Sequence, residues 1–378
     1  MAATIDGHSA MPSRRDVIRT CGSLLAAPFA RGLAAEPASA ASLRVTLARE
    51  FARSSLQSIS PDGTKLCFED WGERGYPVRV LEVGTWRMIY TGRFATRAAG
   101  SMFFADSRTL FLGGVGWESV VDVQTGQRTA TPRKAFDPKR GDPTFPAGDR
   151  AFLVAHYETP PYRTQTLALV EFPGYREIVK VSYATEARKP GPMMGATELS
   201  TEAQPKESDN RRILAYAFDN VLVCRRLEDL GLLWSRPFEP ELEAYKLAVS
   251  ADGSRIAAGV ADRASGHPPR QYYIGVYDAD TGDRAARLPL NGTEWVALSP
   301  NGKLIAVAGR ESGTNGETLP TVHIHEVSSG ARLASVTHDR IKRGRHQWLV
   351  AGCTIGFTSD GKYLVTSGMS TKVWTLGE

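Results

Sequence analysis

The stretch Ser60-Pro61-Asp62-Gly63-Thr64-Lys65-Leu66-Cys67-Phe68 (SPDGTKLCF) joins a polar turn to an apolar run. Variants of it return as SADGSRIAAGV from Ser250, SPNGKLIAVAG from Ser299 and TSDGKYLVTSG from Thr358. In such a turn Pro presets φ for the second position, Asp favours the third and Gly takes the left-handed position that follows. This geometry connects two antiparallel strands, so its recurrence predicts a chain built from hairpins.

The residues after each turn are apolar almost without interruption, as in Ile256–Val260 and Leu304–Ala308. A sheet with one wet face would alternate polar and apolar residues, so these runs predict strands that are covered on both faces. Antiparallel strands of that kind are typical of a stack of small sheets, which is what the blades of a propeller are.

Weaker copies of the turn fill the gaps between the four clear ones. An Asp or Asn in each copy serves as a marker, and successive markers lie 43 to 60 residues apart. The seven markers are Asp62, Asp106, Asp149, Asp209, Asp252, Asn301 and Asp360. This period is expected for four-stranded blades with some long loops. The sequence therefore predicts an all-β fold, a seven-bladed β-propeller of four-stranded antiparallel blades.

Each of the first six units carries a second marker, a strand that ends in an acidic residue and a Gly-containing turn, as in Asp278–Gly282. We interpret Asp122 and Asp278 at these ends as turn-capping side chains rather than general bases. With both markers, the repeat resembles that of the WD40-like β-propellers of bacterial envelopes, including the TolB-type repeat. The resemblance covers the chain after residue 40 and implies one ring-shaped domain. Unlike true WD40 repeats, no unit carries both a Gly-His and a Trp-Asp pair.

The two ends of the repeat region complement each other. The last unit stops at Val373–Leu376, one strand short, whereas Leu43–Leu47 is a strand-like run that precedes the first unit. We predict that this N-terminal strand completes the final blade and closes the ring, because closure removes exposed strand edges.

The first forty residues read as an export signal. Arg14 and Arg15 precede the weakly apolar stretch Gly22–Ala30, and Ala38-Ser39-Ala40 is a small-x-small cleavage site. The arginine pair resembles a twin-arginine (Tat) signal. We predict an export signal at 1–40, a propeller domain at 41–378 and a periplasmic or secreted protein. No segment is long enough to span a bilayer, so no transmembrane segment is expected in the mature chain.

Charge and cysteine usage argue against a nucleic-acid-binding protein and against a disulfide-rich protein. The net charge of +5 becomes +4 once residues 1–40 are removed, which does not indicate nucleic-acid binding. Cys67, Cys224 and Cys353 each lie in an apolar run. Their odd number argues against a disulfide framework, so we predict that they are small buried residues.

In a propeller, the short uniform turns share one face and the long varied connections share the other, where variable loops on a rigid ring often carry function. We take the aromatic and basic residues of these loops as candidate binding residues, because such side chains anchor interfaces. They are Trp71, Trp117, Tyr157, Arg163, Arg263, His267, Arg270, Arg340, Lys342, Arg343, Arg345 and His346. The last five lie in the densest basic segment, which is either a solvated loop or a capture site for an anionic ligand or an acidic partner surface.

The sequence carries no catalytic motif, since G-x-S-x-G, H-E-x-x-H and C-x-x-C are all absent. His323 and His325 share one face of a strand, but a metal site needs further ligands, so we predict no metal site. These observations favour a non-enzymatic module that binds a protein partner or a small anionic ligand. The alternative is a propeller enzyme or cofactor-binding subunit of the lactonase or dehydrogenase-subunit kind, with its site at the mouth of the central channel. No catalytic residue, cofactor or partner is identified by the sequence.

Overall fold

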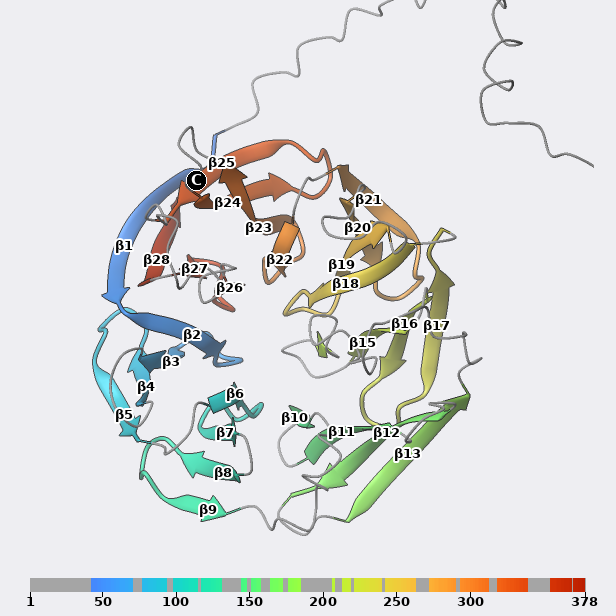
Figure 1. Cartoon of the computed structure of the whole chain (residues 1–378), viewed down its shortest axis with the longest axis horizontal. Coiled ribbons are helices and arrows are strands. Elements are labelled where there is room, and N and C mark those ends of the chain that lie inside the picture. The colour runs from blue at the N-terminus through green and yellow to red at the C-terminus, as the bar shows by residue number, and fades with distance from the viewer. Residues whose placement is uncertain are drawn as a thin grey trace, which may run out of the picture. The chain divides into compact units, whose positions relative to one another are not determined.

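The computed structural model describes residues 42–70, 77–93, 98–114, 117–130, 144–147, 151–157, 164–172, 176–184, 206–207, 213–218, 221–239, 242–262, 272–289, 293–312, 318–338, 354–368 and 370–377. The chain divides into two units, Met1–Ala40 and Ala41–Glu378, and all described residues belong to the second. Within the described ranges every regular element is a strand, and the strands form seven four-stranded antiparallel sheets (Figure 1). The predicted all-β class is therefore confirmed.

The first three sheets follow one another along the chain, each with its strands in sequence order. The first contains β2 (Ser54–Ile59), β3 (Lys65–Asp70), β4 (Val78–Glu82) and β5 (Met88–Gly92). The second contains β6 (Ala98–Phe103), β7 (Thr109–Gly114), β8 (Trp117–Asp122) and β9 (Arg128–Ala130). The third contains β10 (Thr144–Ala147), β11 (Ala151–Tyr157), β12 (Thr164–Glu171) and β13 (Glu177–Ala184).

The next three sheets repeat this order. The fourth contains β14 (Lys206–Glu207), β15 (Ile213–Phe218), β16 (Val221–Arg226) and β17 (Leu232–Pro237). The fifth contains β18 (Leu242–Val249), β19 (Arg255–Asp262), β20 (Tyr272–Asp278) and β21 (Arg284–Pro289). The sixth contains β22 (Thr293–Leu298), β23 (Leu304–Ser312), β24 (Thr318–Glu326) and β25 (Arg332–Thr337).

The seventh sheet takes its strands from both ends of the repeat region. It contains β26 (Thr354–Phe357), β27 (Tyr363–Ser367) and β28 (Ser370–Gly377), with β1 (Arg44–Ala52) paired to β28 as the fourth strand. The register runs antiparallel from Arg44 opposite Gly377 to Ala52 opposite Ser370. The expected pairing of the N-terminal strand with the last strand is therefore present.

First strands of successive sheets contact each other, as β2 does with β6, β18 with β22 and β22 with β26, and β2 also contacts β26 to β28 of the seventh sheet. Figure 1 shows the first strand of each sheet towards a common centre and the fourth strand farthest from it. Seven four-stranded antiparallel sheets in this arrangement fit a seven-bladed β-propeller.

The continuous apolar runs are buried on both faces, as the sequence predicts. In β23, Ile305 to Ala308 are all buried, and Ile305 and Val307 pack towards the fifth sheet while Ala306 and Ala308 pack towards the seventh. Cys67 and Cys224 are free, buried thiols, and burial raises the pKa of each to about 12. Their predicted role as small core residues is confirmed, whereas Cys353 lies outside the described residues.

The repeated turn is held together by its own side chains. Oδ1 of Asp62 accepts hydrogen bonds from the Ser60 hydroxyl at 2.6 Å and the Thr64 N–H at 2.9 Å, and Ser60 Oγ accepts one from the Lys65 N–H at 2.9 Å. Gly63 follows with a φ of 70°, where a Cβ would be strained. The same side-chain bonds recur around Asp252, Asn301 and Asp360. The markers at Asp149 and Asp209 lie outside the described residues.

The second sheet has Ser107, with a φ of 53°, in the left-handed position that Gly63, Gly253, Gly302 and Gly361 take in the other described turns. This conformation costs a non-glycine residue on the order of 1 kcal/mol. The Ser107 hydroxyl accepts a hydrogen bond from the Asp62 N–H at 2.9 Å, so it ties the turn of the second sheet to that of the first. This bond explains why a side chain is useful at that position.

Candidate functional site

The short turns of each sheet lie at the same end of it. The connection after the third strand donates a backbone hydrogen bond to the turn after the first strand, for example from Val83 N–H to Thr64 O at 2.8 Å and from Ala279 N–H to Ser254 O at 3.0 Å. Equivalent bonds join residues 123 and 108 and residues 327 and 303. The longer connections, such as 71–77, 263–271 and 338–353, leave the other end of their sheets. We call that other end the loop-bearing face.

The acidic residues that end the third strands cap these turns. Asp122 accepts hydrogen bonds from the N–H groups of Gln124 (2.9 Å) and Thr125 (3.1 Å) and pairs with Arg108 of the neighbouring turn. The Arg108 guanidinium is the main reason that the pKa of Asp122 lies below its ordinary value. Asp278 makes the equivalent contacts with residues 280 and 281 and with Arg255. Both carboxylates are thus committed to turn structure.

Most of the predicted binding residues lie outside the described residues. These are Trp71, Arg163, Arg263, His267, Arg270, Arg340, Lys342, Arg343, Arg345 and His346. The two that are described occupy strand ends, since Trp117 begins β8 and Tyr157 ends β11. Both positions border a connection of the loop-bearing face, but the described residues do not bring them together.

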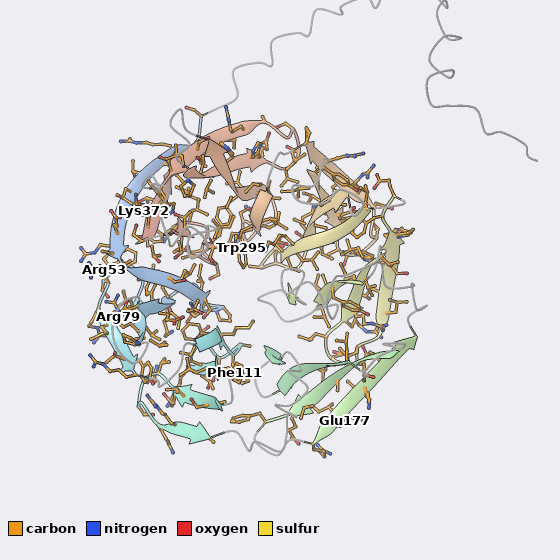
Figure 2. All side chains as sticks on the ribbon, viewed as in Figure 1. Arg53, Arg79, Phe111, Glu177, Trp295 and Lys372 are labelled. Carbon is orange, nitrogen blue, oxygen red and sulfur yellow. The ribbon has the colours of Figure 1, made fainter. Side chains whose placement is uncertain are left out.

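Hydrogen bonds fix the two strand ends that flank the connection 71–77. Arg79 Nη2 donates to Asp70 Oδ1 at 2.5 Å, and the Asp70 N–H donates to Pro77 O at 2.9 Å. These bonds join the end of β3 to the start of β4 and fix both ends of the segment that contains Trp71. Figure 2 shows Arg79 on the outer part of the first sheet.

Near the centre, the inner strands are bulged. The register with the next strand shifts between Ala98 and Gly100 in β6, between Ala244 and Lys246 in β18 and between Thr293 and Trp295 in β22. Such bulges re-aim side chains and are frequent near functional sites. Here they place the Lys246 ammonium 4.1 Å from the centre of the Trp295 ring, in a cation–π contact. Figure 2 labels Trp295 near the centre.

A cleft of about 400 Å³ lies between the fourth and fifth sheets. One wall comes from the end of β17 and the residues after it, and the other from the end of β20, the following turn and the start of β21. The lining residues are Arg236, Pro237, Phe238, Glu239, Tyr277, Gly282, Asp283 and Arg284.

Glu239 is the centre of charge in this cleft. Its Oε2 accepts a hydrogen bond from the Tyr273 hydroxyl at 2.6 Å, while Oε1 lies 3.3 Å from Arg284 Nη1 and 3.7 Å from Arg287 Nη1. The Tyr273 hydrogen bond is the main reason that the pKa of Glu239 lies below its ordinary value, and the arginines add to this effect. The Arg287 guanidinium also lies 4.0 Å from the Tyr273 ring centre. Glu239 is therefore ionised at neutral pH.

Arg236 adds a third guanidinium from β17, on the wall opposite Arg284 and Arg287 of β21. Its Nη2 donates to Thr281 O at 3.0 Å and lies 3.4 Å from Asp283 Oδ1, and its Nε donates to Gly282 O at 3.3 Å. Trp234 supports the same turn by donating from Nε1 to Ala279 O at 2.7 Å. The turn after β20 is thereby fixed against β17, so the cleft has rigid walls.

Sequence reasoning missed this cleft because its residues come from segments more than 30 positions apart. Arg236, Glu239 and Arg284 carry no shared motif, and each is ordinary for a strand end. Only the pairing of the fourth and fifth sheets places them together.

The comparisons with known proteins add no family. No protein-family model matches the chain, and no curated protein matches it either. Among the described residues, no three His, Cys, Asp or Glu side chains are grouped so that they could hold a metal ion. In the same part of the chain, no helix has the length and apolarity needed to cross a membrane.

Proposed function

We propose that the protein is an exported WD40-like β-propeller that binds a protein partner or a small anionic ligand through its loop-bearing face. The observation that carries the proposal is the partition of the connections. The short turns are hydrogen-bonded to each other at one end of the sheets, which leaves the long, varied and basic connections to the other end. A rigid frame with variable loops on one face is typical of binding modules.

Charge-reversal of opposite ends tests this proposal. A loop variant carries Arg340→Glu, Lys342→Glu and Arg343→Glu, and a matched turn variant carries Lys65→Glu, Lys303→Glu and Lys362→Glu at the other end. We expect chemical cross-linking in a periplasmic extract to capture a partner with wild type and the turn variant but not with the loop variant. Equal capture by both variants would contradict the proposal.

Native mass spectrometry addresses the small-ligand form and the enzymatic alternative. The protein is isolated from its own host under native conditions and compared with the mass calculated for residues 41–378. A bound mass that the loop variant loses supports an anionic ligand on this face. A bound mass that survives in the loop variant points instead to a site elsewhere, such as the central channel.

Export is a separate part of the proposal. Residues 1–40 fused to a reporter that is transported only when folded should direct it across the inner membrane, and Arg14→Lys with Arg15→Lys should abolish transport. Transport that persists in the double variant would exclude the twin-arginine route.

We also infer that β1 closes the ring of sheets. Support comes from the pairing of β1 with β28 and from the chain's direct passage from β1 into β2, the inner strand of the first sheet. The first prediction in the Discussion tests this inference.

A further inference from the structure

We propose that the cleft between the fourth and fifth sheets is a second binding site, which takes a small organic carboxylate with an apolar body. The site lies between the end of β17 and the β20–β21 hairpin. It does not depend on the proposed function of the loop-bearing face, because none of its lining residues belongs to the candidate loops.

The cleft carries more positive than negative charge. The three guanidinium groups of Arg236, Arg284 and Arg287 pair with only two carboxylates, those of Glu239 and Asp283. Each guanidinium has five N–H donors, and the Arg284 and Arg287 side chains are 42% and 48% exposed, so donors not used by Glu239 can be reached from the solvent side. An incoming carboxylate would therefore bring the local charges into balance.

The existing ion pairs in the cleft are long. The three guanidinium–carboxylate distances are 3.3, 3.4 and 3.7 Å, whereas a well-made charge-assisted hydrogen bond measures about 2.7 to 2.9 Å. The internal pairs thus leave the arginines short of their best geometry. A ligand carboxylate that approaches Arg284 and Arg236 from the open side can make shorter, bidentate bonds.

The shape and lining of the cleft fit a small ligand. It has a volume of about 400 Å³ and is open to solvent, so it would hold the head and one side of a ligand rather than enclose it. The cleft surface is divided between polar and apolar atoms, and the Phe238 and Tyr277 rings, each only 6% exposed, give it a fixed apolar base beside Pro237. This combination selects a ligand with an anionic head and an apolar body rather than a free inorganic ion.

The Glu239 carboxylate competes with an incoming carboxylate for the arginine donors of this site. It holds Arg284 and Arg287 near the cleft, but it also occupies part of their donor capacity. Replacing it with the neutral amide should free the guanidiniums for an external carboxylate. A purely structural ion pair would give no such gain.

The experiment is ¹⁹F NMR titration of the full chain with 4-fluorobenzoate, using 4-fluorobenzamide as the uncharged probe of the same shape. We expect saturable binding of the benzoate. We expect the affinity of the amide to be lower by a factor of about ten or more. Arg284→Gln and Arg236→Gln should each weaken benzoate binding by about tenfold, whereas Glu239→Gln should strengthen it by about threefold. Arg226→Gln is the matched control, because Arg226 pairs with Asp229 on the surface outside the cleft, and it should change nothing.

Thermal denaturation of each variant separates loss of binding from loss of folding. Equal affinity for benzoate and benzamide would overturn the proposal, and so would unchanged binding in both arginine variants. Weaker binding in a folded Glu239→Gln variant, or the absence of saturable benzoate binding below about 20 mM in folded wild type, would also overturn it.

Discussion

Two joints between neighbouring sheets are built from different chemistry. The joint of the fifth and sixth sheets is dominated by a large apolar cluster, in which Ala248, Ala257, Ile274, Val276 and Leu288 pack against Val296, Leu298, Ile305, Val307 and Val327. The joint of the seventh and first sheets has a smaller apolar cluster and adds polar and aromatic contacts to it. The same repeat thus supports two kinds of joint.

The polar part of the seventh–first joint is a chain of buried hydrogen bonds. Leu56 N–H donates to Ser367 Oγ at 2.9 Å, Ser367 and Thr371 share a bond of 2.9 Å between their hydroxyls, and Thr371 Oγ1 donates to Ser54 O at 3.0 Å. All four residues are buried. The first and last of these bonds each span more than 300 positions in sequence.

The aromatic part lies beside it. Phe51 at the end of β1 contacts Phe68 and Trp86, with ring centres 5.1 and 6.1 Å apart, and Trp86 contacts Tyr363 of the seventh sheet at 5.9 Å. Trp86 makes these contacts from a left-handed backbone position, with a φ of 58°. This ring therefore connects three segments that meet only at this joint.

The difference has a physical reason. The fifth and sixth sheets are joined by a short connection at 290–292, so apolar burial is enough to hold two neighbours that already lie together. In the seventh sheet, β1 leads directly into the first sheet, but β26 to β28 are about 300 residues away from it in sequence and must recognise it. Apolar surfaces are undirected, whereas hydrogen bonds fix one register. The polar joint therefore gives specificity and the apolar joint gives stability.

The largest effect should come from removing the strand that enters the polar joint. Deletion of residues 41–50 takes away most of β1 and leaves β28 without its outer partner. We expect the Tm to fall by about 10 °C or more in scanning calorimetry. The control is Leu47→Ser, because Leu47 is 48% exposed and its replacement should matter little. An unchanged Tm after the deletion would contradict closure by β1.

Next in size is a cavity in the apolar joint. Ile274 is fully buried between the fifth and sixth sheets, so Ile274→Ala removes apolar contacts that surrounding groups cannot fully replace. We expect the free energy of unfolding to drop by about 2 to 5 kcal/mol in urea denaturation. A drop below that caused by Thr371→Val, described next, would reverse the assignment of stability to this joint.

A smaller effect should follow loss of one hydroxyl in the polar joint. Thr371→Val keeps the shape of the side chain but removes the donor to Ser54 O and the partner of Ser367. Because buried polar groups lose their partners, we expect a cost of about 1 to 3 kcal/mol. Thr375→Val, on the half-buried part of the same strand, serves as the control and should cost less than about 0.5 kcal/mol. Equal costs would remove the special role of the polar chain.

The smallest effect is a pH dependence at the edge of the apolar joint. His325 is buried, and its Nδ1 lies 3.1 Å from the oxygen of Gly330, the residue that packs on Leu288. Burial lowers the folded-state pKa of His325 below 6.5. The unfolded chain therefore binds a proton first as pH falls, so stability present above about pH 6.5 is lost below it, by less than about 1.4 kcal/mol per pH unit.

Urea denaturation at several pH values between 5.5 and 7.5 measures this dependence. His325→Gln should flatten the slope in that window, whereas His323→Gln, on the more exposed neighbouring position, should retain it. A slope that is identical in wild type and His325→Gln would assign the pH dependence to another group.

The turns and strands could be predicted from the sequence because their chemistry is local. The carboxylates of Asp62, Asp252 and Asp360 each accept a hydrogen bond from an N–H two residues later, so the pattern that predicts each turn contains the groups that cap it. The pairing of β1 with β28 could be predicted for a different reason, since one strand was missing from the last unit and one was left over before the first.

The cleft and the two kinds of joint could not be predicted in this way. Glu239 meets Tyr273 and Arg284 across two sheets, and Ser367 meets Leu56 across most of the chain. In the sequence, these residues are ordinary strand and turn residues. Their roles depend on which sheet faces which, and a repeat pattern does not contain that information. The predicted loop residues remain predictions, apart from the placement of Trp117 and Tyr157 at strand ends.

The position of β1 also has a consequence for the timing of synthesis. β1 is made early, but its partner β28 ends at residue 377. At ribosomal speeds of about 5 to 20 residues per second, β1 waits on the order of tens of seconds for that partner. During this time its backbone edge is open to other strands. Arg44, Arg49 and Glu50 on this strand give it charges that discourage aggregation while the rest of the chain is being made.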